Sequence, residues 1–270
     1  MSDDTVITEQ VKSAGDPFTT VNGNSENVVT GQPGGQGSSL PLGLQQLASQ
    51  NEITIHQHLD QLEVLLGWQR PCRYSIYGAD SSSQLLYIQE VSECFARQCL
   101  GSSRWFNLRV SDSNQQDVAI FDRPFRCPCG LCWWWCCCVQ ELAVETPPGK
   151  WVSTIREERT AIGSPRYHIS TTHDDDDDLV FVIPTSCCYC KFCADVEILI
   201  YDKRKEEKVC VIHKHSRGSR QECCGSQNEF TIKFLAELNV TEKLMILGAS
   251  FLLDFNFFEG QRRCCCCCCL

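Results

Sequence analysis

The sequence predicts an all-β domain in which antiparallel strands form a barrel or a sandwich, and a barrel fits the pattern better. Eleven short segments alternate β-branched or aromatic residues with polar ones, and Gly, Pro, Asp or Ser turns separate them. No apolar stretch between these segments is long enough for a crossover helix, so a doubly wound α/β sheet is not expected. The candidate strands are Tyr74–Tyr77, Leu85–Gln89, Phe106–Val110, Val118–Phe121, Val139–Val144, Trp151–Ile155, Tyr167–Ser170, Leu179–Ile183, Val196–Tyr201, Lys208–His213 and Phe230–Phe234.

One short helix is predicted before these strands. Ile55, Leu59, Leu62 and Leu66 recur at helical spacing, and Gly67 suits the end of a helix. This helix is expected to form a lid on the barrel or a peripheral surface element.

A second helix is predicted in the one strongly apolar stretch, residues 244–258. Fifteen residues would extend only about 22 Å, against a hydrocarbon core of roughly 30 Å. The stretch also contains Asp254, and a carboxylate is costly near the centre of a bilayer. Two alternatives stay open: a helix that spans a membrane, and a helix buried inside the barrel.

The charge of the chain excludes one class of function and constrains another. The net charge of −10 and the pI near 5.1 argue against a nucleic-acid-binding protein, which needs Lys and Arg to neutralise phosphates. An acidic protein that reaches an anionic membrane surface needs a hydrophobic or covalent anchor. The start, Met1-Ser2-Asp3-Asp4, lacks the features of a secretory signal, so a reducing cytosolic setting is expected.

The 22 cysteines are therefore not expected to form a secreted disulfide framework. Two clusters look like acylation sites, because one adjoins the tryptophans Trp133–Trp135 and the other follows an apolar stretch and an Arg pair. The first cluster comprises Cys127, Cys129, Cys132, Cys136, Cys137 and Cys138, and the second comprises Cys264, Cys265, Cys266, Cys267, Cys268 and Cys269. Several acyl chains would anchor a protein that one chain holds only marginally.

Two alternatives for the cysteines remain. Cys129 and Cys132 could form a tetrahedral zinc site with Cys190 and Cys193, since both pairs are CxxC motifs. Cys267 formally begins a C-terminal prenylation motif, although cysteines at the two middle positions match it poorly.

Several motifs, taken in order, resemble the phospholipid scramblase family. They are Gln57–Trp68, Phe121–Cys127, Thr146–Gly149, Cys190 and Cys193 before Asp195–Glu197, and Leu247–Phe255. The resemblance covers roughly residues 44–259, so we divide the chain into a disordered N-terminal arm (1–43), a scramblase domain (44–259) and an Arg- and Cys-rich tail (260–270). The Gly, Ser, Asn and Gln content of the arm supports its disorder.

The resemblance carries implications for fold and function. It implies an all-β domain with one central helix: a closed antiparallel tubby-like β-barrel of about twelve strands around a hydrophobic C-terminal helix. It also implies calcium-dependent, ATP-independent, bidirectional movement of phospholipids, palmitoyl groups on the cysteine cluster, and a plasma-membrane location.

The family's acidic calcium loop corresponds to residues 226–237 of this chain. Ser226 and Asn228 stand where the family has aspartates, and Phe230 matches the phenylalanine of the family's loop. Glu237, at the twelfth position, is the one acidic position of that loop that still has a carboxylate. Because calcium affinity depends on the number of charged oxygen ligands, any calcium binding here is expected to be weak. The run Asp174–Asp178 is a second acidic segment and is interpreted as a solvated loop.

The predicted function is that of a lipid translocator without covalent chemistry, held at the cytoplasmic face of the plasma membrane. Its expected partners are membrane phospholipids, together with proteins that bind the N-terminal arm, and nucleic acid is not expected. The main alternative is an acyl-anchored adaptor or lipid-binding barrel that does not scramble lipids. A soluble enzyme or metalloprotein is less favoured, because no Ser, His and Asp set has a recognisable catalytic context.

Overall fold

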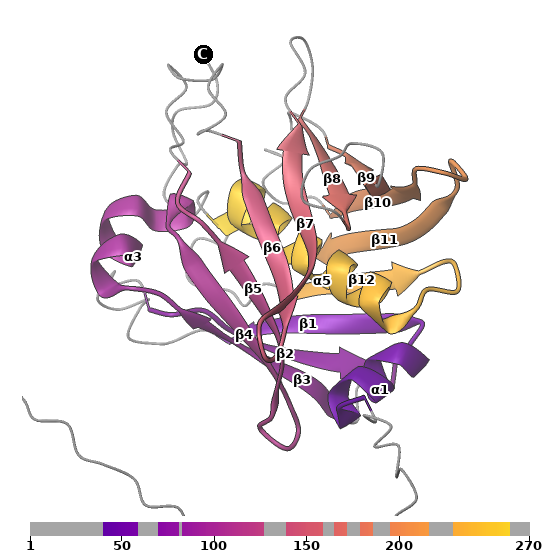
Figure 1. The fold of residues 1–270 in the computed structure, drawn as a ribbon, viewed down its shortest axis with the longest axis horizontal. Helices are drawn as coiled ribbons and strands as arrows, with labels where there is room; N and C mark the ends of the chain where they lie inside the picture. The colour runs from indigo at the N-terminus through magenta and orange to yellow at the C-terminus, as the bar shows by residue number, and fades with distance from the viewer. Residues whose placement is uncertain are drawn as a thin grey trace, which may run out of the picture. The chain divides into compact units, whose positions relative to one another are not determined.

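The computed structural model describes residues 40–58, 70–80, 83–126, 139–158, 165–171, 179–185, 195–215 and 229–259 (Figure 1). The chain divides into residues 1–38 and 39–270, and every described residue belongs to the second unit. Residues 1–39 of the arm predicted at 1–43, and the Cys-rich tail, lie outside the described residues; the arm ends earlier than predicted, because Leu42 and Gly43 already belong to a helix.

Twelve antiparallel strands form one closed barrel, so the prediction of an antiparallel barrel is confirmed. Each strand pairs with its neighbours in sequence, and β1 pairs with β12 to close the ring. The strands are β1 (Glu52–His58), β2 (Arg73–Gly78), β3 (Gln84–Val91), β4 (Phe106–Asp112), β5 (Asp117–Arg123), β6 (Glu141–Thr146), β7 (Lys150–Glu158), β8 (Arg166–Ser170), β9 (Leu179–Pro184), β10 (Val196–Asp202), β11 (Lys208–His215) and β12 (Glu229–Phe234).

All eleven predicted strands are present, and the structure adds β1. The prediction that Ile55 begins a helix is wrong, because Ile55 lies in β1 and pairs with Ile76 and Phe230. Ile53, Ile55 and Gln57 are buried in alternation, which is the period of a strand. The other residues of that predicted helix lie outside the described residues.

The C-terminal helix α5 (Val240–Asp254) runs inside the ring of strands and continues as the single-turn π-helix η5 (Phe255–Glu259) (Figure 1). Every residue from Lys243 to Asp254 is buried, which places the apolar stretch within protein. The helix starts four residues earlier than predicted, where Asn239 and Glu242 form a capping box. Gly248 allows close packing, since a Cβ there would lie 3.0 Å from Val144 Cγ2.

The carboxylate of Asp254 has a partner at the end of α5. Lys214 Nζ lies 3.1 Å from Asp254 Oδ1, and it also lies over the rings of Phe230 and Phe258. The pairing and the cation–π contacts reduce the cost of burying both charges. Among the described helices, none has both the length and the apolar character required to cross a membrane.

The two ends of the barrel differ in the elements that cover them. At the first, which we call the α1 end, α1 (Leu42–Ser49) packs beside the start of α5. Lys243 Nζ there donates to the carbonyl oxygens of Ala48 and Gln50 at 2.6 and 2.7 Å. The opposite end, which we call the α3 end, carries α3 (Cys94–Leu100) and the 3-10 turn η1 (Gly101–Ser103) between β3 and β4.

Candidate functional site at the α3 end of the barrel

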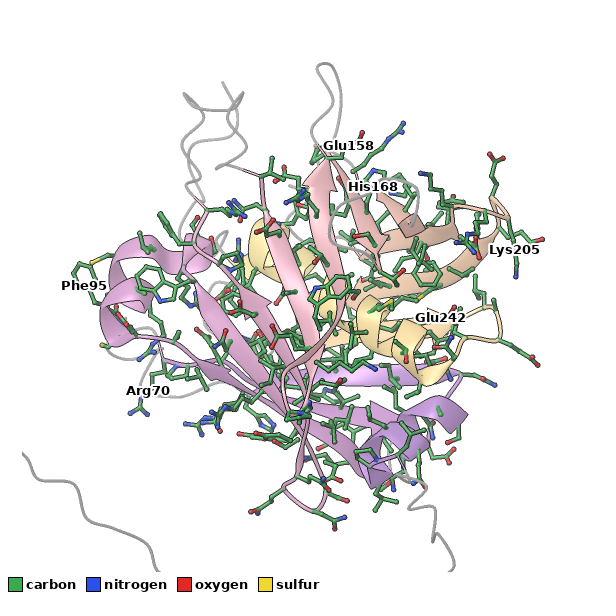
Figure 2. All side chains as sticks on the ribbon, in the orientation of Figure 1. Arg70, Phe95, Glu158, His168, Lys205 and Glu242 are labelled. Atoms are coloured by element: carbon green, nitrogen blue, oxygen red, sulfur yellow. The ribbon has the colours of Figure 1, made fainter. Side chains whose placement is uncertain are left out.

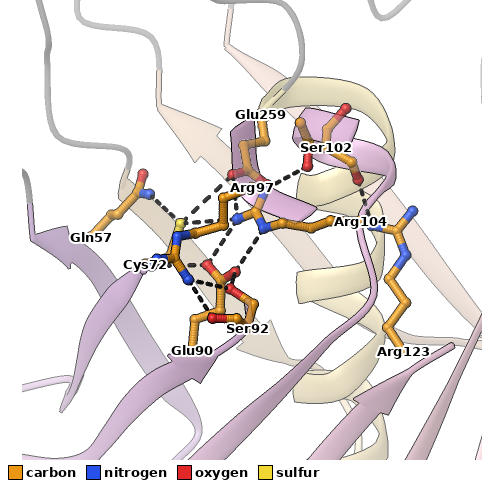
Figure 3. Close-up of polar contacts among 10 residues, drawn as sticks. Gln57, Cys72, Glu90, Ser92, Arg97, Ser102, Arg104, Arg123 and Glu259 are labelled. Atoms are coloured by element: carbon orange, nitrogen blue, oxygen red, sulfur yellow. Dashed lines mark hydrogen bonds and ion pairs between the residues drawn. The ribbon is translucent and has the colours of Figure 1, made fainter. Parts of the chain in front are cut away.

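A buried arginine organises the polar groups at the α3 end. Arg104 follows η1, and its guanidinium donates to both oxygens of Glu90 on β3 at 2.7 and 2.8 Å (Figure 3). The same guanidinium donates to Glu259 Oε1, in the last turn of η5, at 2.9 Å. The Arg104 side chain is 1% exposed and that of Glu90 is fully buried. One cation thus joins two carboxylates that are 169 residues apart in sequence, Glu90 and Glu259.

Neighbouring groups add further hydrogen bonds to this cluster. The backbone N–H of Cys72 donates to Glu90 Oε2 at 2.9 Å, and the Cys72 thiol lies 3.6 Å from Glu259 Oε1. Ser92 Oγ donates to Glu90 Oε1 and in turn accepts from Arg97. Figure 3 shows these side chains converging on Glu90 and Arg104 from the residue before β2, the residue after β3 and helix α3. The cluster therefore fixes α3 and η5 to the barrel wall.

A second arginine ties η5 to β5. Arg123 donates to the carbonyl oxygen of Ser102, to Gln140 Oε1 and to Asn256 Oδ1, each at 2.7 Å. Its guanidinium also lies over the rings of Phe106 and Phe255, at 5.5 and 5.9 Å from their centroids. Burial lowers the pKa of Arg123 to about 10, so it stays protonated at neutral pH.

The pKa values of the two carboxyl groups around Arg104 are shifted in opposite directions. Burial disfavours the charged form of Glu90, but its hydrogen bonds and attraction to Arg104 outweigh this and lower its pKa. Burial raises the pKa of Glu259 to about 7, although Arg104 opposes the shift. Within the described part of the chain, Glu259 Oε2 has no hydrogen-bond partner, which is consistent with a carboxyl group that is hard to ionise.

We expect the raised pKa of Glu259 to make the barrel less stable as pH rises. Between pH 4.5 and about 7 the unfolded chain loses the Glu259 proton while the folded chain keeps it, so the unfolded state is favoured. Glu259→Gln should remove roughly 2–3 kcal/mol of this loss. Urea unfolding at pH 5 and pH 7.5 measures it, with exposed Glu237→Gln as control. An identical pH dependence in wild type and Glu259→Gln would contradict the assignment.

A groove of about 500 Å³ lies beside this cluster, between the β3–β4 connection and the end of β5. Its lining is partly aromatic, and Trp105 meets Phe125 edge to face at 5.9 Å between ring centroids. The pKa of Asp122, which also lines the groove, is raised by burial and by the nearby charge of Glu145. The lining residues are Val91, Ser92, Glu93, Trp105, Phe106, Asn107, Asp122, Arg123, Pro124 and Phe125.

The site residues proposed from the sequence fall mostly outside the described residues. This holds for both acylation clusters, for the zinc alternative, for Ser226 and Asn228, and for the run Asp174–Asp178. Phe230 is buried in β12, whereas Glu237 is exposed beyond the other end of that strand. The structure does not bring these two together, since the strand from Phe230 to Phe234 alone spans about 13 Å and Glu237 lies beyond its end. In the described segments, no three His, Cys, Asp or Glu side chains are placed to hold a metal ion.

Comparison with known proteins identifies the family. A family model described as Scramblase matches residues 32–260, most of the chain. The chain belongs to the scramblase family. It is 34% identical to human "Phospholipid scramblase 1" over 222 residues, which cover 82% of this chain and 67% of that protein. Membership supports a phospholipid scramblase-like function.

Two further relatives agree with this assignment. "Phospholipid scramblase 2" of Bos taurus is 32% identical over 83% of this chain and 74% of its own. Human "Phospholipid scramblase family member 5" is 31% identical over 82% of this chain and 79% of its own. A porin-like protein from Bacteroides uniformis aligns with 68% of this chain and 96% of its own at 8% identity, but its TM-score of 0.18 is too low to support any argument.

Sequence reasoning about this scramblase-family chain missed the Arg104 cluster. Glu90, Arg104 and Glu259 stand in three separate segments, and each alone reads as an ordinary surface residue. One local signal was present. In β3 the buried positions Leu86 and Ile88 are apolar, and the next buried position in the same phase holds the charged Glu90. A charged residue in the inward phase of a strand predicts a buried partner of opposite charge.

Proposed function

We propose that this protein moves phospholipids between the two leaflets of a membrane, in both directions and without ATP. The observation that supports the proposal is the scramblase-family match across residues 32–260. We further propose attachment to the cytoplasmic face of the plasma membrane by palmitoyl groups on the Cys127–Cys138 and Cys264–Cys269 clusters. Two acylated segments would supply the second signal that stable anchoring requires.

We propose that calcium has at most a weak effect on this activity. Of the two carboxylates in residues 226–237, Glu229 and Glu237, only Glu237 stands where the family's loop has an acidic residue, and it lies beyond the far end of β12 from Phe230. A hard divalent cation needs several oxygen ligands around one point. The loop of this chain offers fewer charged ligands than that requires.

One structural observation favours the alternative, a membrane-tethered adaptor. Helix α5 and the inward side chains of the strands occupy the interior of the barrel, and Leu247 and Phe251 are at most 1% exposed. Lipid headgroups therefore have no route through the middle of the described barrel. If lipids cross, they cross beside the protein, where it disturbs the bilayer.

Reconstitution separates translocator from adaptor. We expect vesicles containing the purified full-length protein and a trace of fluorescent lipid to lose nearly all fluorescence to dithionite, because scrambling brings inner-leaflet lipid to the outside. Protein-free vesicles should lose only the outer-leaflet signal. Adding calcium, or replacing Glu237 by Gln, should change the rate less than twofold. Fluorescence loss equal to that of protein-free vesicles, with protein bound, would reject the translocator and leave the adaptor.

A further inference from the structure

The barrel topology attaches the segments that hold most of the cysteines to one end of the barrel. In a closed ring of antiparallel strands, successive connections alternate between the two ends. The connections that follow β1, β3, β5, β7, β9 and β11 all lie at the α3 end, as the pairs Phe106 with Arg123 and Arg166 with Pro184 show. Glu259, the last described residue, also lies there through its bond to Arg104.

All the cysteines except Cys210 fall in these connections or after Glu259. They are Cys72; Cys94 and Cys99; the six of residues 127–138; Cys187, Cys188, Cys190 and Cys193; Cys223 and Cys224; and Cys264–Cys269. Five of the six tryptophans also belong to connections at the α3 end. They are Trp68, Trp105 and Trp133–Trp135, whereas Trp151 lies in β7. Segments far apart in sequence are thus all attached to one face of the molecule.

The described surface at this end exposes three large hydrophobic side chains beside a partly aromatic groove. Val91, Phe95 and Phe125 expose 48%, 72% and 46% of their area, although all three are large hydrophobic residues. Figure 2 shows Phe95 projecting from α3 away from the barrel. Val91 and Phe125 line the groove together with Trp105, whose indole is the kind of group that settles at a membrane interface. We call Val91, Phe95, Trp105 and Phe125 the aromatic rim.

The chain continues from the rim into the first cysteine cluster. Phe125 is two residues from Cys127, and Cys94 directly precedes Phe95. A lipid attached to cysteines in this neighbourhood brings the rim to the bilayer, so the exposed side chains and the proposed anchor point to the same partner. The α1 end differs, because its connections hold no cysteine and include Asp174–Asp178, Glu206 and Glu207.

We propose that the α3 end rests on the membrane and that the aromatic rim inserts into the bilayer interface by itself, without acylation, while the α1 end faces away. The inference rests on the proposed membrane function and adds the orientation of the barrel and the side chains that contact lipid. The partner is a bilayer surface whose anionic headgroups are not needed for binding, so a zwitterionic bilayer suffices, because the chain carries a net charge of −10 and Glu93 and Asp122 border the groove. Burial of apolar side chains, rather than attraction to anionic lipid, provides the binding.

The test uses full-length protein treated with hydroxylamine and reductant to remove thioester-linked acyl chains. We expect it to float with phosphatidylcholine vesicles, with little change between low and high salt. Phe95→Asp and Phe125→Asp should each lower the partition coefficient roughly tenfold, because a charge replaces a side chain that enters the interface. The matched controls are Leu42→Asp and Leu235→Asp, which alter exposed hydrophobic residues at the α1 end and should bind like wild type.

A second measurement needs no variant. In hydrogen exchange with and without vesicles, the amides of α3 (Cys94–Leu100) should gain protection and those of α1 (Leu42–Ser49) should not. No flotation of the wild type, equal loss from rim and control variants, or protection at α1 alone would each overturn the inference. The dithionite assay on the same proteins keeps the two proposals apart: absent scrambling with rim-dependent binding intact counts against the proposed function only.

Discussion

Replacement of Arg104 by methionine is expected to destabilise the folded barrel by about 3–5 kcal/mol, because two buried carboxyl groups lose their shared cation. Glu90 is fully buried and its lowered pKa depends on the hydrogen bonds from Arg104. Methionine fills a similar volume but donates no hydrogen bond. Glu90 then either stays charged without a partner or takes up a proton, and both outcomes cost free energy at neutral pH.

Urea denaturation at pH 7 measures this effect, and Arg109→Met is the matched control. Arg109 lies on β4, five residues from Arg104, but its side chain is exposed, so its replacement should change the unfolding free energy by less than about 0.5 kcal/mol. Lowering the pH to 5 should reduce the effect of Arg104→Met, since protonation of the orphaned carboxylates becomes easier. A loss below about 1 kcal/mol at pH 7 would show that the cluster contributes little.

The strands could be predicted from sequence because each carries its own signal. In β4, Phe106, Leu108 and Val110 are buried while Asn107 and Arg109 are exposed, and this alternation is visible in five residues of chain. Strand β1 has the same alternation at Ile53 and Ile55, but Ile55 also matched a helical spacing to later leucines. A short segment can satisfy both periods, and the closure of the barrel decides between them.

The polar cluster could not be predicted in the same way. Arg104 meets Glu259 only because the ring closes around α5 and carries η5 to the α3 end. No local pattern encodes a contact across 155 residues. The attachment of the cysteine-bearing segments to one end has the same origin, because these segments are scattered in sequence and only the alternation of connections brings their described ends to the α3 end.

The location of α5 was also open at the level of sequence, since an apolar helix can be buried in lipid or in protein. Phe251→Ala tests the outcome. Phe251 is 1% exposed, and its ring meets those of Tyr74 and Phe121 at 4.9 and 6.0 Å between centroids. Truncation leaves a cavity bounded by strands on both sides, so we expect a loss of about 3–5 kcal/mol in the unfolding free energy.

Phe95→Ala is the control for Phe251→Ala, because it removes the same atoms from a side chain that is 72% exposed. It should change the unfolding free energy by less than about 0.5 kcal/mol. Both variants are measured by urea denaturation of the full-length protein without lipid or detergent. Under these conditions α5 can contribute to stability only by packing inside the barrel, because no bilayer is present. If Phe251→Ala lowered the unfolding free energy as little as Phe95→Ala, the packing of the strands around α5 would not be the source of the barrel's stability.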